Sequence, residues 1–179
     1  MRGPLVVTGG VASGKSTVAG FLRECGWDVL DSDAVAREAF ESVPVQDWLR
    51  SQLGERADLR TAARNRLGDR EFRAGLNRLT HPYIYGRLRE YSGDALEIPL
   101  LVESGLASAF GPVLVCDCPL DVARRRLEIR LGGRGAAEGL LASQAVPTAR
   151  RMFADYLVRT DLPLDSVRQM VQTIAKSLR

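Results

Sequence analysis

The segment that most constrains how this chain can fold is GGVASGKST, residues 9–17, which matches the pattern G-x-x-x-x-G-K-[S/T]. Residues 5–8 are apolar enough for a short buried strand, and residues 15–24 carry apolar side chains at helical spacing. A glycine-rich turn that happens to contain a lysine is the alternative interpretation. The strand before the segment and the helix after it favour a phosphate-binding loop, or P-loop.

The residue types of this segment suit a polyphosphate ligand. Its glycines let the backbone curl so that successive N–H groups point inward, and the helix N-terminus adds partial positive charge. Lys15 can reach the β- and γ-phosphates, and the hydroxyl of Ser16 can ligate Mg²⁺. We therefore expect nucleotide binding at Gly10, Val11, Ala12, Ser13, Gly14, Lys15, Ser16 and Thr17.

A second apolar segment, residues 27–31, runs into the sequence Asp31-Ser32-Asp33 just before another helical pattern. Ligands of α/β proteins bind at the carboxyl ends of parallel strands, so both aspartates fall where chemistry is expected. Asp33 has a second interpretation as a simple helix cap.

Residues 44–92 differ in character, because apolar residues recur at helical spacing and no strand-like alternation occurs. We predict an insertion of several short helices with breaks near Gly54, Gly68 and His81-Pro82. In a P-loop protein such an insertion suits the binding of a phosphate-accepting substrate. A purely structural cover is the alternative.

Two nearly unbroken apolar runs, residues 95–101 and 113–118, predict strands that are covered on both faces. We place the acids Glu103 and Asp117 at the ends of these strands. Either acid could assist a magnesium ion, and either could instead cap or pair within the fold.

An arginine-rich helix is predicted at residues 119–130, where Arg126 and Arg130 are four residues apart and share one face. The sequence Gly132-Gly133-Arg134-Gly135 follows, so residues 126–144 resemble a lid that brings cations over the phosphates. A solvated charged face is the alternative, and it fits Arg124 and Arg125 better. Further elements are expected at residues 136–144, 147–153 and 156–158, and in a final helix with the stripe Val167, Met170, Val171, Ile174 and Leu178.

Composition limits the partners of this chain of 179 residues, which we interpret as a single domain. Its arginines are spread along the sequence without interleaved aromatic residues, so no nucleic-acid partner is expected. Three cysteines without a CxxC spacing and a single histidine disfavour zinc and disulfides, and Cys116 and Cys118 are expected to be buried thiols. Without a membrane-length run or signal peptide, we expect a cytoplasmic protein, monomeric or weakly homo-oligomeric, with no membrane partner.

Taken in order, these motifs resemble the dephospho-coenzyme A kinase family of small P-loop kinases. The resemblance covers nearly the whole chain, and the combination of motifs is more specific than the loop alone. It is carried by TGGVASGKST at residues 8–17, by Asp31, Asp33, Val35, Ala36 and Arg37, by Arg64, Leu67, Phe72, Leu76, Leu79, His81 and Pro82, by PLLVES at residues 99–104, and by Arg126, Arg130, Gln144, Ala154 and Asp155.

The resemblance implies a three-layer α/β P-loop NTPase fold with a parallel five-stranded sheet, a helical substrate-binding insertion and a lid. It implies ATP and Mg²⁺ as cofactors and transfer of the γ-phosphate to the ribose 3′-hydroxyl of dephospho-coenzyme A. Lys15, Arg126 and Arg130 would then stabilise charge and Asp33 would accept the hydroxyl proton. The acceptor would contact Asp33, Arg37, Arg64 and His81.

Three positions depart from the family pattern, namely Ala123, Leu131 and Thr160. They fall in the lid and on the adenine side of the site, so they bear on the choice between ATP and GTP. Two other functions remain open: a P-loop kinase for a nucleoside, nucleotide or shikimate-like alcohol, and a nucleotide-dependent switch. The sequence lacks the guanine-specific N-K-x-D motif that would favour a switch.

Overall fold

The computed structural model describes residues 3–55, 58–107, 109–142, 144 and 146–179, and it divides the chain into two compact units. The first unit comprises Met1–Asp31 and Ser92–Arg179, and the second comprises Ser32–Tyr91. The second unit therefore begins at Ser32, ahead of residue 44, where the sequence analysis starts the helical insertion. No helix of the described residues is both long enough and apolar enough to cross a membrane.

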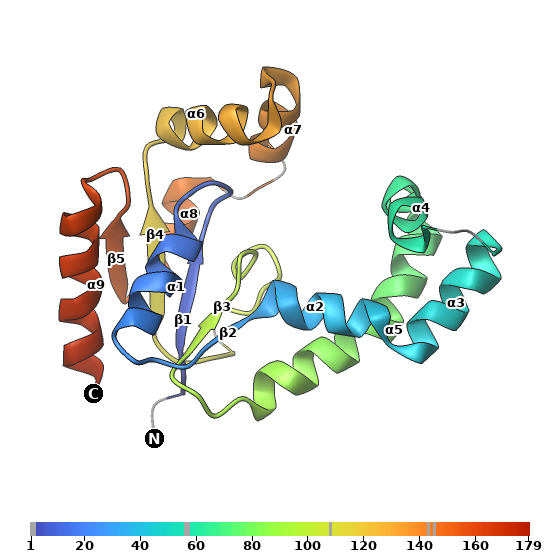
Figure 1. Ribbon diagram of the computed structural model, residues 1–179, viewed down its shortest axis with the longest axis horizontal. Coiled ribbons are helices and arrows are strands. Elements are labelled where there is room, and N and C mark those ends of the chain that lie inside the picture. The colour runs from blue at the N-terminus through green and yellow to red at the C-terminus, as the bar shows by residue number, and fades with distance from the viewer. Residues whose placement is uncertain (1–2, 56–57, 108, 143, 145) are drawn as a thin grey trace. The chain divides into compact units, whose positions relative to one another are not determined.

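The first unit is built on a parallel sheet of five strands (Figure 1). The strands are β1 (Leu5–Gly9), β2 (Val29–Asp31), β3 (Ala95–Glu97), β4 (Val113–Asp117) and β5 (Tyr156–Arg159), in the order β2-β3-β1-β4-β5. Its helices are α1 (Lys15–Glu24), α6 (Leu120–Leu131), α7 (Arg134–Ala142), α8 (Pro147–Arg151) and α9 (Leu164–Leu178). The predicted α/β fold with a parallel five-stranded sheet is confirmed.

The order of the strands determines where a ligand can bind. β1 lies in the middle of the sheet, with β3 on one side and β4 on the other. The chain leaves β1 toward one edge and later returns to the opposite side, and such reversals open a crevice at the carboxyl ends of the strands. The loop after β1 is therefore at the position where ligands bind in folds of this kind.

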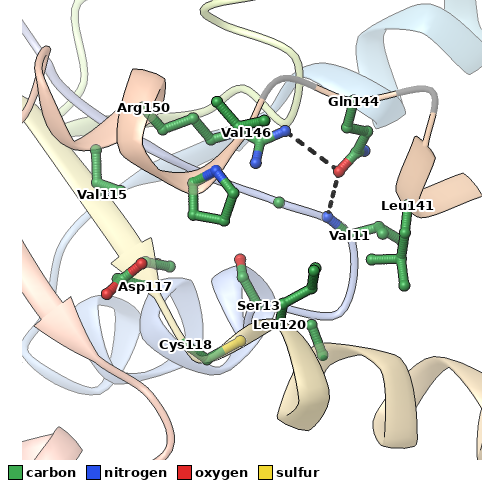
Figure 2. A pocket seen from close by; sticks show the side chains of 14 residues that line it. Val11, Ser13, Val115, Asp117, Cys118, Leu120, Leu141, Gln144, Val146 and Arg150 are labelled. Carbon is green, nitrogen blue, oxygen red and sulfur yellow. Dashed lines mark hydrogen bonds between the residues drawn. The ribbon is translucent and has the colours of Figure 1, made fainter.

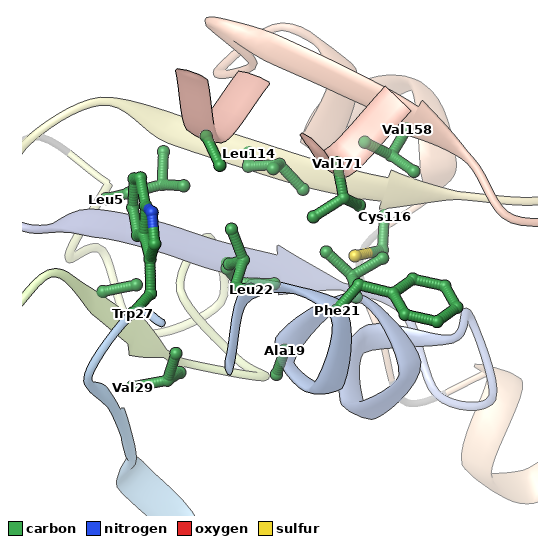
Figure 3. Close-up of a cluster of buried hydrophobic side chains, with 14 of the residues drawn as sticks. Leu5, Ala19, Phe21, Leu22, Trp27, Val29, Leu114, Cys116, Val158 and Val171 are labelled. Carbon is green, nitrogen blue, oxygen red and sulfur yellow. The ribbon is translucent and has the colours of Figure 1, made fainter. Parts of the chain in front are cut away.

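The core of the first unit lies between the sheet and helices α1 and α9 (Figure 3). Leu5 and Val7 of β1 belong to this cluster together with Leu114 of β4, while Val6 between them is also fully buried. Because side chains of a strand alternate between faces, β1 is covered on both sides, which explains its unbroken apolar sequence. The predicted stripe of the last helix packs into this cluster, with Val167 and Val171 buried and Met170, Ile174 and Leu178 partly buried.

The third strand is shorter than the sequence indicates. We predicted a strand over residues 95–101 with Glu103 at its end, but β3 stops at Glu97. Ile98 still donates its N–H to the carbonyl of Val7 at 2.9 Å, and then Pro99, which has no N–H, begins a turn. The acid at the carboxyl end of β3 is therefore Glu97 and not Glu103.

The second unit consists of the helices α2 (Ser32–Glu41), α3 (Val43–Leu53), α4 (Leu59–Arg66) and α5 (Arg70–Glu90) (Figure 1). The predicted breaks near Gly54 and Gly68 are confirmed. The predicted break at His81-Pro82 is wrong, because α5 continues through Pro82. Buried Leu76 and Leu88 hold the helix by tertiary packing on either side of the proline, which outweighs the loss of one backbone hydrogen bond.

The helices of the second unit enclose their own small core, made of Val45, Leu49, Leu59, Ala63, Phe72 and Leu76. The ring of Trp48 is tilted by 37° against that of Phe72 with 5.1 Å between the centroids, and it also covers Gly75 of α5. A Cβ atom at Gly75 would lie 2.5 Å from Cζ2 of Trp48, closer than any real contact. A Cβ atom at Gly86, on the same helix, would meet nothing within 4 Å.

We predict that Gly75→Ala destabilises the second unit by about 1–3 kcal/mol through overpacking, although alanine is the better helix former. Gly86→Ala is the matched control, and it should raise stability by up to about 1 kcal/mol. Urea unfolding followed by circular dichroism and by tryptophan fluorescence measures both changes. Equal stability of the two variants would show that Trp48 does not pack against Gly75.

Candidate active site

The loop between β1 and α1 has the backbone shape that its sequence predicts. Gly9 has a φ of 156° and Gly14 a φ of 84°, and Gly14 directly precedes the first residue of α1. A Cβ atom at Gly9 would lie 2.5 Å from Oγ of Ser13, and one at Gly14 would lie 3.1 Å from Cβ of Thr160. The N–H groups of Thr17 and Val18 both donate to the carbonyl of Gly14 at 3.1 Å, and the amides at the start of a helix together carry a partial positive charge that suits an anion.

Lys15 lies along this loop. Its Nζ donates hydrogen bonds to the carbonyl oxygens of Gly9 at 3.0 Å and Gly10 at 2.8 Å. The ammonium group therefore sits beside the amides that begin α1, and it adds a full positive charge to the partial charge of the helix N-terminus. An anion bound over the loop meets both.

The acidic side of the site is formed by Glu97, at the end of β3. Oγ of Ser16 donates to Oε1 of Glu97 at 3.4 Å, and Asp31 of β2 is the register partner of Glu97. Burial raises the pKa of the Glu97 carboxyl, and the negative charge of Asp31 raises it further, while the cations Lys15 and Arg23 act in the opposite direction. The sequence analysis missed Glu97 because it extended the strand past this residue.

The two acids that the sequence analysis did propose for magnesium have other partners. Oε1 of Glu103 accepts a hydrogen bond from Arg150 at 2.5 Å, and Oδ2 of Asp117 accepts one from Arg151 at 2.8 Å. Both carboxylates are thus neutralised by arginine in this structure. Neither has the hydrogen bond to the Ser16 hydroxyl that Glu97 has.

The donor atoms near Ser16 fit Mg²⁺ in kind. Magnesium prefers oxygen ligands and usually takes one or two from the protein, with water and substrate phosphates completing the shell. Ser16 offers a hydroxyl and Glu97 a carboxylate, with Asp31 beside them. Within the described residues no group of three or more His, Cys, Asp or Glu side chains gathers as a metal site.

The cationic side of the site borders a cavity of about 410 Å³. Arg126 and Arg130 of α6 both line it, as does the P-loop from Ala12 to Thr17. Nη2 of Arg126 donates to the carbonyl of Thr160 at 2.7 Å and Nη1 to the carbonyl of Ala12 at 3.4 Å. Arg130 is exposed, and its side chain forms no hydrogen bond or ion pair with any other described residue.

A smaller cavity of about 110 Å³ borders Gly10, Val11 and Ser13 of the same loop (Figure 2). Gln144 and Arg150 also line it, and Arg150 is 5% exposed. The sequence analysis did not single out Arg150, because one arginine among many carries no signal of burial; Gln144 entered only through the family resemblance.

Two cysteine thiols lie at the carboxyl end of β4. Cys116 pairs in register with Gly9, and Cys118 lines the smaller cavity. Both are free and buried, as predicted, and burial raises the pKa of each thiol.

The predicted site residues fall into two groups. The structure brings Lys15, Ser16, Arg126 and Arg130 together around the larger cavity of the first unit. The residues predicted to bind the acceptor all belong to the second unit, where Asp33 and Arg37 lie on α2, Arg64 on α4 and His81 on α5. All four are exposed, and the His81 ring lies 5.3 Å from that of Tyr85. Of the predicted lid, residues 126–144, residue 143 lies outside the described part of the chain.

The fold and the P-loop define the class of protein to which this chain belongs, and comparison with known proteins identifies its family. A parallel sheet of this order with GxxxxGKS after its central strand is that of a P-loop nucleotide-binding protein. A family model for dephospho-CoA kinase matches residues 5–165. The chain belongs to the dephospho-CoA kinase family, as its motifs predict.

Similar proteins agree with this assignment. The dephospho-CoA kinase of Bacillus licheniformis is 31% identical, over 95% of this chain and 90% of that protein. That of Mycobacterium tuberculosis is 35% identical over 91% of this chain, which spans only 44% of the mycobacterial protein's length. A crystal structure from Thermus thermophilus superposes with a TM-score of 0.84 at 29% identity, covering all of both chains.

More distant structures share the fold alone. Dephospho-CoA kinase from Campylobacter jejuni has a TM-score of 0.74 at 21% identity, covering 99% of this chain and 98% of that one. A shikimate kinase from Acinetobacter baumannii has a TM-score of 0.60 at 19% identity, covering 99% of this chain and 93% of that one. The architecture is therefore common to small-molecule kinases with different acceptors.

The raised pKa of Glu97 predicts an effect on stability. Its folded-state pKa lies above the ordinary value of 4.5, so its contribution to stability is full below that value and is lost as the pH rises through the folded pKa. Above pH 4.5 the fold is therefore less stable than it would be if this carboxyl kept its ordinary pKa. Glu97→Gln should therefore raise the unfolding temperature by about 2–4 °C in magnesium-free buffer at pH 7, and the gain should shrink toward pH 4.5.

Thermal unfolding followed by circular dichroism between pH 4.5 and 7.5 measures this difference. Glu55→Gln, at an exposed position, is the control and should leave the unfolding temperature unchanged. A lower unfolding temperature for Glu97→Gln at pH 7 would mean that Lys15 and Arg23 outweigh the cost of burial.

Proposed function

We propose that this chain transfers the γ-phosphate of ATP to the ribose 3′-hydroxyl of dephospho-CoA, giving coenzyme A. The observation that carries the proposal is family membership over residues 5–165 combined with an intact P-loop at the carboxyl end of β1. Its partners are then small molecules, and we place it in the cytoplasm as a monomer or weak homo-oligomer. The experiment that tests the proposal is a coupled assay of ADP release with ATP and Mg²⁺, with and without dephospho-CoA.

In this proposal the P-loop binds the triphosphate. The amides of residues 10–17 surround the phosphates, and Lys15 exchanges its bonds to the Gly9 and Gly10 carbonyls for charge-assisted bonds to the β- and γ-phosphates. Ser16, supported by Glu97, would hold Mg²⁺, and Asp31 lies beside them. When bound, the ion neutralises phosphate charge.

The transfer itself needs positioning and charge stabilisation more than covalent help. The acceptor oxygen forms a bond to the γ-phosphorus as the bond from that phosphorus to the bridging oxygen breaks, and ADP leaves. The hydroxyl proton goes to the carboxylate of Asp33. Arg130 and Arg126 offset the charge that develops; the exposed, unpaired guanidinium of Arg130 among the described residues supports its direct contact with phosphate.

The second unit would bind the acceptor. Dephospho-CoA carries a diphosphate and a ribose, and arginine and histidine are suited to both groups. We propose Arg37, Arg64 and His81 for these contacts, with the helices of residues 44–92 as the acceptor-binding part of the chain. The exposure of these three side chains supports the assignment.

Two other functions predict different results in the same assay. A kinase for a nucleoside or a shikimate-like alcohol would phosphorylate that acceptor and leave dephospho-CoA unchanged. A nucleotide-dependent switch would hydrolyse ATP slowly and respond to no acceptor. Family membership favours the first proposal over both alternatives.

Lys15→Ala should lower kcat/KM for ATP by at least about 100-fold, because the β- and γ-phosphates lose their cation. Lys176→Ala is the control, since Lys176 is the one other lysine of the chain and is exposed on α9. Steady-state kinetics at saturating acceptor measures the effect. An unchanged kcat/KM for Lys15→Ala would overturn the P-loop assignment.

Asp33→Asn should lower kcat by about 100-fold or more while ATP binding survives, because an amide cannot accept the hydroxyl proton. Asp165→Asn is the matched control, since Asp165 occupies the first turn of α9 as Asp33 occupies that of α2. Both variants remove the same helix-terminal charge. If kcat falls equally in both, Asp33 acts only on its helix and is not the proton acceptor.

A further inference from the structure

The tip of the P-loop, residues 10–13, is supported by residues far away in the sequence. The N–H of Val11 donates to Oε1 of Gln144 at 2.7 Å (Figure 2). The same oxygen accepts from Nη2 of Arg150 at 3.3 Å. Two donors thus converge on one amide oxygen, which fixes the Gln144 side chain against the loop. Gln144 is the last residue of the lid segment, residues 126–144.

The other end of the lid segment contacts the next residue of the loop. Arg126 donates to the carbonyl of Ala12 at 3.4 Å and to that of Thr160 at 2.7 Å. The buried hydroxyl of Thr160 in turn donates to the carbonyl of Ser13 at 2.7 Å. Val11, Ala12 and Ser13 are therefore each hydrogen-bonded to a different residue of the C-terminal half.

Gly10 completes this series by a close approach. A Cβ atom there would lie 3.1 Å from Nη1 of Arg150, so the glycine leaves room for the guanidinium beside the loop. Arg150 is itself held by Glu103. The support of Gln144 thus rests on an ion pair in which Arg150 is buried and Glu103 is partly exposed.

The backbone at this tip needs support. Ala12 has a φ of 56°, and no other residue besides glycine has a positive φ in the part of the chain that the structure describes. The left-handed region is disfavoured for a residue with a Cβ atom, and such strain persists only where the surroundings hold it. The hydrogen bonds at Val11, Ala12 and Ser13 are those surroundings.

We infer that Gln144, Arg126 and Thr160 are positioning residues that hold the strained tip of the P-loop, so that nucleotide affinity depends on both ends of the lid segment. This inference rests on the proposed function only for the identity of the nucleotide. It goes beyond that function because it gives roles to Gln144 and Thr160, neither of which needs to touch the substrate.

A double-mutant cycle between Gln144 and Ala12 tests the inference. Gln144→Met keeps the length of the side chain and removes the oxygen that accepts the hydrogen bond of Val11. Ala12→Gly removes the backbone strain that this hydrogen bond helps to hold. The affinity of a non-hydrolysable ATP analogue with Mg²⁺ is measured by calorimetry for the wild type, both single variants and the double variant. Gln172→Met, at an exposed position on α9, is the control.

We expect Gln144→Met to weaken binding about tenfold in the wild-type background and only about twofold to threefold in the Ala12→Gly background. If Gln144 had only a general structural role, Gln144→Met would weaken nucleotide binding by the same factor in both backgrounds. Equal losses, or a loss below twofold in the wild-type background, would overturn the inference. Unfolding temperatures identify variants that do not fold. The cycle is repeated with Thr160→Val, a smaller change of side chain that removes the hydroxyl bonded to the carbonyl of Ser13.

The analogue binds without an acceptor, so this experiment separates the two proposals. Absence of dephospho-CoA phosphorylation would defeat the proposed function and leave the cycle interpretable. Conversely, normal turnover of dephospho-CoA with unchanged affinity in Gln144→Met would leave the proposed function standing and overturn the inference.

Discussion

The structure depends on the close approach of the P-loop backbone to its neighbours. Gly9 lies against the carbonyl of Cys116 on β4, and Gly14 lies against Thr160, just beyond β5. A Cβ atom at Gly9 would have no room, and one at Gly14 would press on Thr160 at 3.1 Å. Both glycines have a positive φ, a conformation that glycine adopts readily. Because β1 is central and parallel to both neighbours, the loop emerges among the carboxyl ends of several strands. The groups that surround it therefore come from distant parts of the sequence.

Charge is separated across this loop in a way that suits a magnesium-bound polyphosphate. Glu97 and Asp31 place negative charge beside Ser16, and Arg126 and Arg130 line the cavity over the same loop. Lys15 lies between these groups, bonded to loop carbonyls. The buried carboxylate is unfavourable on its own, and such a cost is common where a site is organised for a cation that arrives with the substrate.

Local patterns in the sequence predicted most of the fold and part of the site. The P-loop, the strands β1 and β4 and the stripe of α9 follow from spacing and composition, which act over a few residues. The end of β3 was missed because Ile98, Leu100 and Leu101 continue an apolar run after the strand has ended at Glu97. The break predicted at Pro82 is wrong because the helix is held there by the tertiary packing of Leu76 and Leu88, which a local pattern does not show. The burial of Arg150 depends on Glu103, 47 positions earlier, and no local pattern encodes that pairing.

The two thiols at the carboxyl end of β4 can be considered together with the chemistry of the proposed acceptor. Dephospho-CoA ends in a thiol, and when that thiol is part of a disulfide, a cysteine thiolate beside the loop could attack it, forming a mixed disulfide as the other sulfur leaves as a thiolate. Such exchange requires a thiolate and access to it. Cys116 and Cys118 are buried and held in the protonated form, so neither requirement is met. The fold thus keeps these two thiols unreactive toward a proposed acceptor that carries a thiol itself.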